Sequence, residues 1–392
     1  MSAELPDKNP AAARAPRVAI VHDHLAQAGG AERVALALHR AFPGAPIFTA
    51  VYDADATYPE FRAADVRTSF LQRWARRTKI FRLAFPFYPA AFEQFDLGGF
   101  DVVVSSSSGF AKGVITGPET CHICYCHTPA RFAWRYHEYV TQGGFGRGTR
   151  RVLPGLVHYV RLWDAVSAQR VDHFVANSRN VARRIRKFYG RPSEIVYPPV
   201  DVGRFRVAAE GPPGDYYLVV SRLLGYKRVD LAVEAMNRLR RPLKVVGVGP
   251  DAARLRRMSG PTVEWLGRLP DDAVADLLAG CRAFLFCGEE DFGIAPLEAT
   301  ASGRPVIAFG AGGALESVLE NETGVFFREP TPEALCEAIE RMDTLPPFDP
   351  QRLQAHARSF DVSVFQERMR AIVRARWEEH RAVDQDSSGA GP

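Results

Sequence analysis

The feature that most constrains the fold is a unit that recurs along the chain: an apolar run, a glycine or polar turn, and a stretch with helical periodicity. The first unit is "RVAIVHDHL" followed by "AQAGGAERVALALHRAF". A buried strand that enters a helix through a glycine turn opens a doubly wound parallel sheet. Similar units begin at "DVVVSSSSGFAKG", "HICYCHTP" and "DHFVANSRNVARRIRKFYG". The pattern predicts an α/β fold.

A proline-rich break, "RPSEIVYPPVDVGRF", interrupts the units, and they start again at "YYLVVSRLLGYKRVDLAVEA". Proline resists helix formation, so the break suits a connector. A chain of 392 residues also exceeds the size of one typical core. We predict two Rossmann-like doubly wound domains, 17–195 and 196–365, then a helix at 366–382 with no strand after it. The segments 1–16 and 383–392 have the composition of disordered tails.

Composition excludes several classes of protein. The apolar content of 46% and the charged content of 24% are those of a globular protein, and the net charge of +5 is too small for an obligate nucleic-acid binder. No apolar run is long enough for a membrane span, and the N-terminus lacks the apolar segment of a secretory signal. We therefore expect a cytoplasmic protein with no nucleic-acid partner.

Carboxylates stand where the apolar run "AFLF" ends. Glu290 follows this expected strand, and Glu298 lies in the first turn of a helix that Pro296 can begin. Ligands of parallel sheets collect at the carboxyl ends of the strands, and a helix N-terminus attracts phosphate. A carboxylate there can also accept hydrogen bonds from sugar or ribose hydroxyls. The alternative is that Glu298 only caps the helix and that Glu290 is solvated.

Two cations follow the first expected strand of the second domain. Arg222 comes directly after the strand, and Lys227 precedes the next helix. Together they could neutralise a diphosphate, although a solvated basic loop is the alternative. Parallel strands of one sheet present their carboxyl ends on the same side. Acids for hydroxyls and bases for phosphates would therefore meet in one crevice, and a nucleotide-sugar needs both.

These residues resemble the retaining glycosyltransferases of family 4, which have the GT-B fold. The resemblance rests on "EDFGIAPLE" followed by "ATASGRPVIA", on "SRLLGYKRVDLAVEA", on "YPPVDVGRF" and on "GGAER", and it spans about 17–375. It implies two domains that face a central cleft containing the active site. It also implies that the last helix crosses back onto the first domain.

The resemblance further assigns roles to single residues. Glu290 would lie near the donor sugar, Glu298 would bind ribose hydroxyls, and Arg222 and Lys227 would hold the diphosphate and stabilise the leaving nucleotide. His127 would contact the transferred sugar. The implied sets are Glu290, His127, Arg222 and Lys227 for catalysis; Arg222, Lys227, Phe292, Gly293, Ile294 and Glu298 for the donor; and Gly29 and Gly30 for the phosphate or acceptor side.

The segment "CHTPARFAW" resembles a subset of the family that makes bacterial surface polysaccharides, often from GDP-mannose. This implies a hexosyltransferase that moves mannose from GDP-mannose to a glycan or lipid-linked acceptor. Because Arg222 and Lys227 already offer cations to the diphosphate, we expect that no metal or other cofactor is needed. A UDP-sugar donor, or water as the acceptor in a hydrolase or epimerase, remains an alternative. A packed histidine beside Trp134 is the alternative role for His127.

Some residues are also compatible with a metal site or with another class of protein. Asp53 and Asp55 form an acid-x-acid pair of the kind that holds a divalent ion on a diphosphate, but a turn is the simpler reading. The cysteines of "CHICYCH" could bind zinc or form a buried strand, and no second ligand pair is visible. An NAD-type oxidoreductase lacks its glycine fingerprint after the first strand; "VVGVGPDAA" is a weak match. A non-catalytic binding protein is disfavoured by the acid and base pairs.

Arginines and aromatic residues alternate in "VRTSFLQRWARRTKIFRLAFPFYPAAF". Cations mixed with aromatic side chains suit the anionic surface of a bilayer, while a solvated basic helix is the alternative. The segment 67–87 therefore predicts peripheral contact with the inner face of the plasma membrane. The residues concerned are Arg67, Phe70, Arg73, Trp74, Arg76, Arg77, Lys79, Phe81, Arg82, Phe85 and Phe87.

Overall fold

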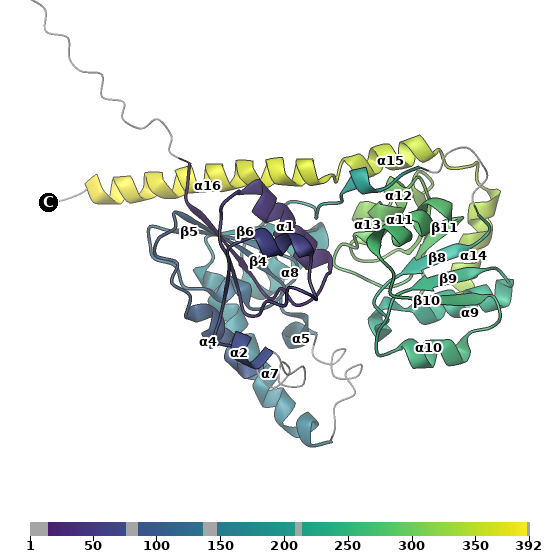
Figure 1. The fold of residues 1–392 in the computed structure, drawn as a ribbon, viewed down its shortest axis with the longest axis horizontal. Coiled ribbons are helices and arrows are strands. Elements are labelled where there is room, and N and C mark those ends of the chain that lie inside the picture. Colours follow the sequence, from purple (N-terminus) through teal and green to yellow (C-terminus); the bar gives the residue numbers. More distant parts are fainter. Residues whose placement is uncertain (1–14, 76–84, 136–146, 208–213, 390–392) are drawn as a thin grey trace, which may run out of the picture.

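The first domain is built on a seven-stranded parallel sheet. The computed structural model describes residues 15–75, 85–135, 147–207 and 214–389, and Figure 1 shows two domains beside one long helix. The strand order is β3-β2-β1-β4-β5-β6-β7. The strands are β1 (Val18–His22), β2 (Ile47–Thr49), β3 (Val66–Thr68), β4 (Val102–Ser107), β5 (Cys121–Cys126), β6 (His173–Ala176) and β7 (Glu194–Ile195).

The second domain repeats this plan with a six-stranded parallel sheet in the order β10-β9-β8-β11-β12-β13. The strands are β8 (Tyr217–Val220), β9 (Leu243–Val246), β10 (Val263–Gly267), β11 (Ala283–Phe286), β12 (Val306–Phe309) and β13 (Gly324–Phe327). The central strands of both sheets are almost wholly buried because helices cover both faces. The predicted pair of Rossmann-like doubly wound domains is confirmed.

The helices of the first domain are α1 (Gly30–Ala41), α2 (Gln72–Ala75), α4 (Tyr88–Glu93), α5 (Arg131–Trp134), α7 (Arg147–Ser167) and α8 (Arg179–Tyr189). Those of the second are α9 (Val229–Leu239), α10 (Ala252–Met258), α11 (Asp271–Gly280), α12 (Ala295–Ala301), α13 (Ala314–Ser317), α14 (Pro332–Thr344), α15 (Pro350–Arg358) and the long α16 (Val362–Gly389). Short 3₁₀ helices are η1 (Pro59–Ala63), η2 (Phe85–Phe87), η3 (Ala111–Gly113), η4 (Ala168–Arg170), η5 (Val202–Arg204) and η6 (Gly225–Lys227). In the described part of the chain, no helix combines the length and apolarity that a membrane crossing needs.

The last helix, α16, follows the second domain in sequence but packs on the first. Phe365, Met369, Val373 and Trp377 recur every four residues and are buried in the first domain's core. Figure 1 shows α16 extending along the first domain. The sequence placed this helix at 366–382 and a disordered tail at 383–392. That end was wrong, because "AVDQDSSG" contains no proline and the helix continues to Gly389.

The two passages of chain between the domains are hydrogen-bonded to each other. The Val200 N–H donates to the Phe360 carbonyl at 2.9 Å, and the Val362 N–H donates to the Val200 carbonyl at 3.1 Å. Val200 lies within the proline-rich break, and Val362 begins α16. The segment that leaves the first domain and the segment that returns to it therefore run side by side.

Both sheets reverse their order of strand addition at one point. In the first sheet this point lies between β1 and β4, and in the second between β8 and β11. The loops that follow such strands form the crevice where ligands of open α/β sheets bind. The loops of the two domains touch here, because a Cβ on Gly30 would lie 3.2 Å from the Ile294 side chain.

Candidate active site

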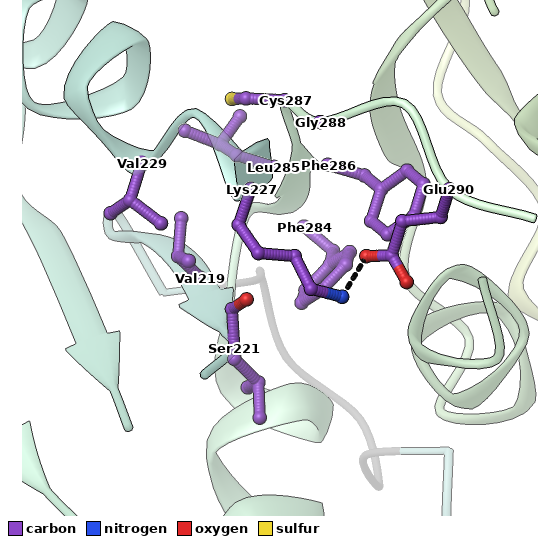
Figure 2. Close-up of a pocket in the computed structure, with 11 residues that line it drawn as sticks. Val219, Ser221, Lys227, Val229, Phe284, Leu285, Phe286, Cys287, Gly288 and Glu290 are labelled. Carbon is purple, nitrogen blue, oxygen red and sulfur yellow. Dashed lines mark ion pairs between the residues drawn. The ribbon is translucent and has the colours of Figure 1, made fainter. Parts of the chain in front are cut away.

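A small pocket lies at the carboxyl ends of β8 and β11. Its lining includes Ser221 and Lys227 from the loop after β8, and Gly288 and Glu290 from the loop after β11. Figure 2 shows the Lys227 ammonium directed at the Glu290 carboxylate, and the two form an ion pair. Both side chains are about four-fifths buried, with 16% and 20% exposed. The sequence predicted both as site residues, and the structure brings them into contact.

Arg222 is not part of this pocket lining. It follows β8 as expected, but its side chain is exposed and donates to Gln27 Oε1 at 3.3 Å. Gln27 belongs to the glycine loop of the first domain and in turn donates to Glu32 Oε1 at 3.1 Å. Arg222 therefore lies at the boundary of the two domains, in the same loop as Lys227 but outside the pocket.

Glu298 lies in the first turn of α12, as predicted, but it is engaged by the other domain. Arg33, from α1, donates to Glu298 Oε1 at 2.9 Å and to Asp271 Oδ2 at 3.1 Å. The Arg33 Nε also donates to the Tyr58 hydroxyl at 2.7 Å. Burial alone would lower the pKa of Arg33, but the Glu298 carboxylate raises it above its ordinary value, so the guanidinium stays charged.

The loop between Glu290 and Glu298 is fixed by close packing. Gly293 has φ +84°, and a Cβ there would lie 2.5 Å from the Phe286 ring. Phe292 is buried and stacks on Tyr197, with ring centroids 5.3 Å apart. Phe292 thus acts as a core anchor for the loop, while Ile294 faces Gly30 of the first domain.

His127 follows β5 in the first domain and is buried. Its Nε2 lies 2.8 Å from Ser106 Oγ, and the same hydroxyl lies 3.1 Å from His22 Nδ1. The His22 and His127 rings meet edge to face at 6.4 Å. Burial lowers the pKa of His127 to about 4, so its imidazole is neutral near pH 7. His127, which follows β5, therefore lies where the carboxyl ends of β1, β4 and β5 meet, since His22 ends β1 and Ser106 lies in β4.

The predicted glycine pair has two different environments. Gly29 precedes α1, and a Cβ there would lie 2.8 Å from Glu32 Oε2. Glu32 is buried, with the His22 and His24 Nε2 atoms each 4.0 Å from its Oε1. Gly30 instead meets Ile294 across the domain boundary. At both positions the close neighbour is the end of a side chain, which can shift to admit a Cβ.

The sequence missed Asp291 and its partners. Arg184 from α8 and Arg131 from α5 both pair with the Asp291 carboxylate. Neither arginine was among the site residues predicted from the sequence. Nothing in the local pattern separates Arg184 from its neighbours; the signal is only its helical phase, which turns it toward the buried side of α8.

Glycines after β12 were also missed as site residues. A Cβ on Gly312 would lie 2.3 Å from the Glu290 carbonyl oxygen, and one on Gly313 would lie 2.1 Å from Phe292 Cα. The Gly313 N–H donates to the Glu290 carbonyl at 2.9 Å. The segment "GAGG" was not among the predicted site residues, and in the structure its glycines pack against the Glu290 loop.

Asp53 and Asp55, weighed above as metal ligands, have partners in a turn. Asp53 Oδ1 accepts the Asp55 N–H at 3.1 Å, and Asp55 pairs with Arg62 at 2.7 Å. Cys121, Cys124 and Cys126 lie in the buried strand β5.

Among the described residues, Cys121, Asp172 and His380 hold potential ligand atoms within 4.8 Å of one another, outside the loops of the site. Burial raises the pKa of the Cys121 thiol to about 12, which disfavours the thiolate that metals bind. That the reaction needs no metal stays a prediction.

The basic and aromatic segment 67–87 is only partly described, because 76–84 lies outside the described residues. Of the part that is described, Arg67 pairs with Asp65 at 2.8 Å. Phe70 and Phe87 expose 36% and 48% of their surface. Arg73 is exposed on α2.

Two family models together match both domains. The model described as "Glycosyltransferase Family 4" matches residues 28–204, and the model described as "Glycosyl transferases group 1" matches 205–359. The border between the two matches falls at the connector that the structure shows.

Two curated relatives are mannosyltransferases by name. Alpha-1,3/1,6-mannosyltransferase ALG2 of Homo sapiens is 28% identical over 83% of this chain and 87% of its own length. The GDP-mannose-dependent alpha-(1-6)-phosphatidylinositol monomannoside mannosyltransferase of Mycolicibacterium smegmatis is 32% identical over 41% of this chain and 50% of its own length.

Solved structures share the two-domain fold. Sucrose-phosphate synthase from Thermosynechococcus elongatus has a TM-score of 0.69 at 16% identity, covering 91% of this chain and 98% of that one. HepE of Anabaena, in complex with UDP, has a TM-score of 0.67 at 16% identity, covering 91% of this chain and all, 100%, of that one. At this identity the likeness establishes the fold.

Proposed function

This chain belongs to the family 4 glycosyltransferases, which have the GT-B fold, and we propose that it transfers mannose from GDP-mannose to a glycan or lipid-linked acceptor with retention. The observation that carries the proposal is the Lys227–Glu290 pair at the carboxyl ends of β8 and β11. The two relatives that are mannosyltransferases by name support the choice of sugar. The name of the mycobacterial relative also supports the choice of nucleotide and of a lipid acceptor.

The charges of the site suit the chemistry of donor cleavage. The bond between the anomeric carbon and the diphosphate oxygen breaks, and negative charge develops on that oxygen. As the new bond forms, the proton of the acceptor hydroxyl passes to the departing diphosphate. Lys227 supplies a fixed positive charge where this oxygen departs, and Arg222 lies in the same loop. Glu290 holds the ammonium in place before the donor arrives.

His127 and Glu298 would recognise hydroxyl groups. A neutral imidazole exchanges hydrogen bonds with a sugar hydroxyl without adding a charge, which fits a pKa of about 4. Glu298 would accept from ribose hydroxyls once Arg33 yields the carboxylate. Because protein cations face the diphosphate, the reaction would need no divalent metal, and transfer should be unchanged by EDTA.

A thermal-shift series tests the donor. GDP, UDP, ADP, dTDP and NAD are each added with and without Mg²⁺, and we expect GDP alone to raise the melting temperature, independently of Mg²⁺. A response to UDP would replace the proposed donor by a UDP-sugar. No response to any diphosphate, or a response to NAD alone, would contradict a sugar-nucleotide site.

Substitutions in the pair test the catalytic roles. Lys227→Ala and Glu290→Ala should each lower transfer from GDP-mannose by at least about 100-fold, the scale of losing a charge partner of the transition state. Full activity in either variant would contradict the assigned role. Free mannose as the sole product, with every acceptor supplied, would assign a hydrolase instead.

We further propose that the enzyme works in surface polysaccharide synthesis at the cytoplasmic face of the plasma membrane. The long helix α7 packs its inner face on the first domain through Leu156, Val160 and Trp163. On its outer side, large apolar residues recur at helical spacing and are at least half exposed; they are Tyr159, Leu162 and Val166. An apolar stripe on a helix suits insertion between lipid headgroups.

Liposome cosedimentation tests this contact. The wild type should sediment with vesicles that contain phosphatidylglycerol at low salt. The triple variant Tyr159→Ser, Leu162→Ser, Val166→Ser should not sediment, while Leu315→Ser, at another exposed apolar residue, should behave as the wild type. Equal sedimentation of both variants would exclude α7 from the contact.

A further inference from the structure

We propose that Asp291, held by Arg184 and Arg131, is the positioning residue that sets Glu290 against Lys227 when the two domains meet. The proposal rests on the proposed function, because it concerns the geometry of the transfer step. It concerns a residue that need not touch the donor. Asp291 is the neighbour of Glu290 in sequence, but its partners all come from the other domain.

The first domain supplies the partners of the Asp291 carboxylate and carbonyl oxygens. One carboxylate oxygen pairs with Arg184 of α8, and the other lies 2.6 Å from Arg131 of α5. The backbone carbonyl accepts the Ser178 hydroxyl at 2.7 Å. The carboxylate is 14% exposed, so these charged contacts are shielded from solvent more than a surface ion pair would be.

The two arginines also contact the other parts of the site. Arg184 Nη1 lies 3.4 Å from Thr128 Oγ1, next to His127 in the chain. Arg131 lies over the Tyr226 ring at 5.3 Å, next to Lys227. The Asp291 cluster, which we define as Asp291, Arg131 and Arg184, therefore connects the loops that carry His127, Lys227 and Glu290.

The cluster constrains Glu290 through the backbone. Consecutive Cα atoms are about 3.8 Å apart, so a shift of Asp291 is passed to Glu290 with little loss. On the opposite side the Gly313 N–H holds the Glu290 carbonyl at 2.9 Å. Glu290 is thus fixed between its own domain and the first domain. Misplacement of a catalytic group by about 1 Å can cost about 100-fold in rate.

This arrangement predicts a separation of binding from catalysis. The proposed contacts to the nucleotide, Lys227 and Glu298, belong to the second domain and do not touch Asp291. Loss of the cluster should therefore lower kcat for the donor while affinity for the nucleotide is kept. If Asp291 had only a structural role, its loss would lower the stability of the fold. The kcat and the affinity for the nucleotide would then fall together or both stay unchanged.

The test uses the full-length protein and three variants. Asp291→Asn keeps the shape and removes the charge, Arg184→Lys keeps the charge and removes the planar fork, and Arg186→Ala, at an exposed arginine of the same helix, is the matched control. GDP release from GDP-mannose, with water as the acceptor where no other is supplied, gives kcat and KM. GDP binding is measured by thermal shift, and hydrogen exchange reports on 287–293.

We expect Asp291→Asn to lower kcat by about 10- to 100-fold, Arg184→Lys to fall between it and the wild type, and Arg186→Ala to match the wild type. KM and the GDP shift should change less than about 3-fold, and exchange in 287–293 should rise in Asp291→Asn. Unchanged kcat and exchange in Asp291→Asn would overturn the proposal. If the wild type consumes no sugar nucleotide, the proposed function fails; hydrogen exchange then decides alone whether Asp291 fixes the Glu290 loop.

Discussion

Two buried imidazoles give the molecule a sensitivity to acid at the scale of single residues. Burial lowers the pKa of His122 and of His127 to about 4 from an ordinary 6.5. Between these values the unfolded chain binds protons that the folded chain does not. The free energy of unfolding must therefore fall as the pH drops from 6.5 to 4, by up to about 3 kcal/mol for each imidazole.

His127→Asn should flatten this dependence. We expect urea unfolding at pH 7, 6, 5 and 4.5 to show a smaller loss of stability in the variant, because one of the two imidazoles no longer titrates. His158→Asn, at an exposed histidine of α7, serves as the control and should keep the wild-type slope. A slope unchanged in His127→Asn would mean that His127 is protonated as readily in the folded state as in the unfolded one.

At this scale the sequence predicted single residues but not their partners. Lys227 and Glu290 could be placed together because each follows a strand of one parallel sheet. The Arg33–Glu298 contact could not, because its residues lie 265 positions apart and in different domains. The assignment of Glu298 to a ribose is a prediction that this contact does not test. Asp291 was invisible for the same reason, since a single acid beside Glu290 carries no pattern of its own.

At the scale of elements, the turn after β12 controls the loop after β11. Gly313 has φ −74°, which any residue adopts, yet a Cβ there would lie 2.1 Å from Phe292 Cα and 2.6 Å from the Asp291 carbonyl oxygen. The contact is with backbone, which cannot turn aside as a flexible side chain could. Gly313→Ala should therefore displace the Glu290 loop or lower stability by about 1–3 kcal/mol.

Chemical denaturation and GDP release measure the two outcomes of Gly313→Ala. Gly99→Ala is the control, because a Cβ on Gly99 would meet nothing within 4 Å. A small gain in stability is expected of that control from the lower entropy of its unfolded chain. Wild-type stability together with wild-type turnover in Gly313→Ala would show that the loop has another position available.

The repeating units were predictable as elements because a buried parallel strand is apolar on both faces. The turns that support these elements were less predictable from the sequence. "GAGG" looks the same in sequence whether it begins a helix or lies under another loop, and only the contact with Phe292 separates the two. The end of α16 was misplaced because polar composition predicted a tail, while the absence of proline allowed the helix to continue.

At the scale of the whole molecule, several ion pairs between the two domains have the same sense. The first domain supplies arginines, and the second supplies carboxylates. The ion pairs are Arg33 with Glu298 and Asp271, Arg131 and Arg184 with Asp291, and Arg135 and Arg184 with Glu289. Most of these contacts are partly exposed, so dissolved ions reach them and weaken them.

Raising NaCl from 50 mM to 1 M should therefore separate the domains. The Debye length falls to about 3 Å at 1 M, so attraction across the boundary is screened. Small-angle X-ray scattering should show a larger radius of gyration at high salt, and the Arg33→Ala variant should reach that value at lower salt. A radius independent of salt would mean that packing, such as Ile294 on Gly30, holds the domains together.

The two hydrogen-bonded chain passages at Val200 and Val362 determine how such a separation would proceed. Two adjacent chain passages permit rotation of one domain about the line that joins them. They resist translation of the domains and rotation about other axes. Displacement then grows in proportion to distance from that line. A substrate would therefore enter from the side remote from the connector, and groups near the connector would keep their relative places through each turnover.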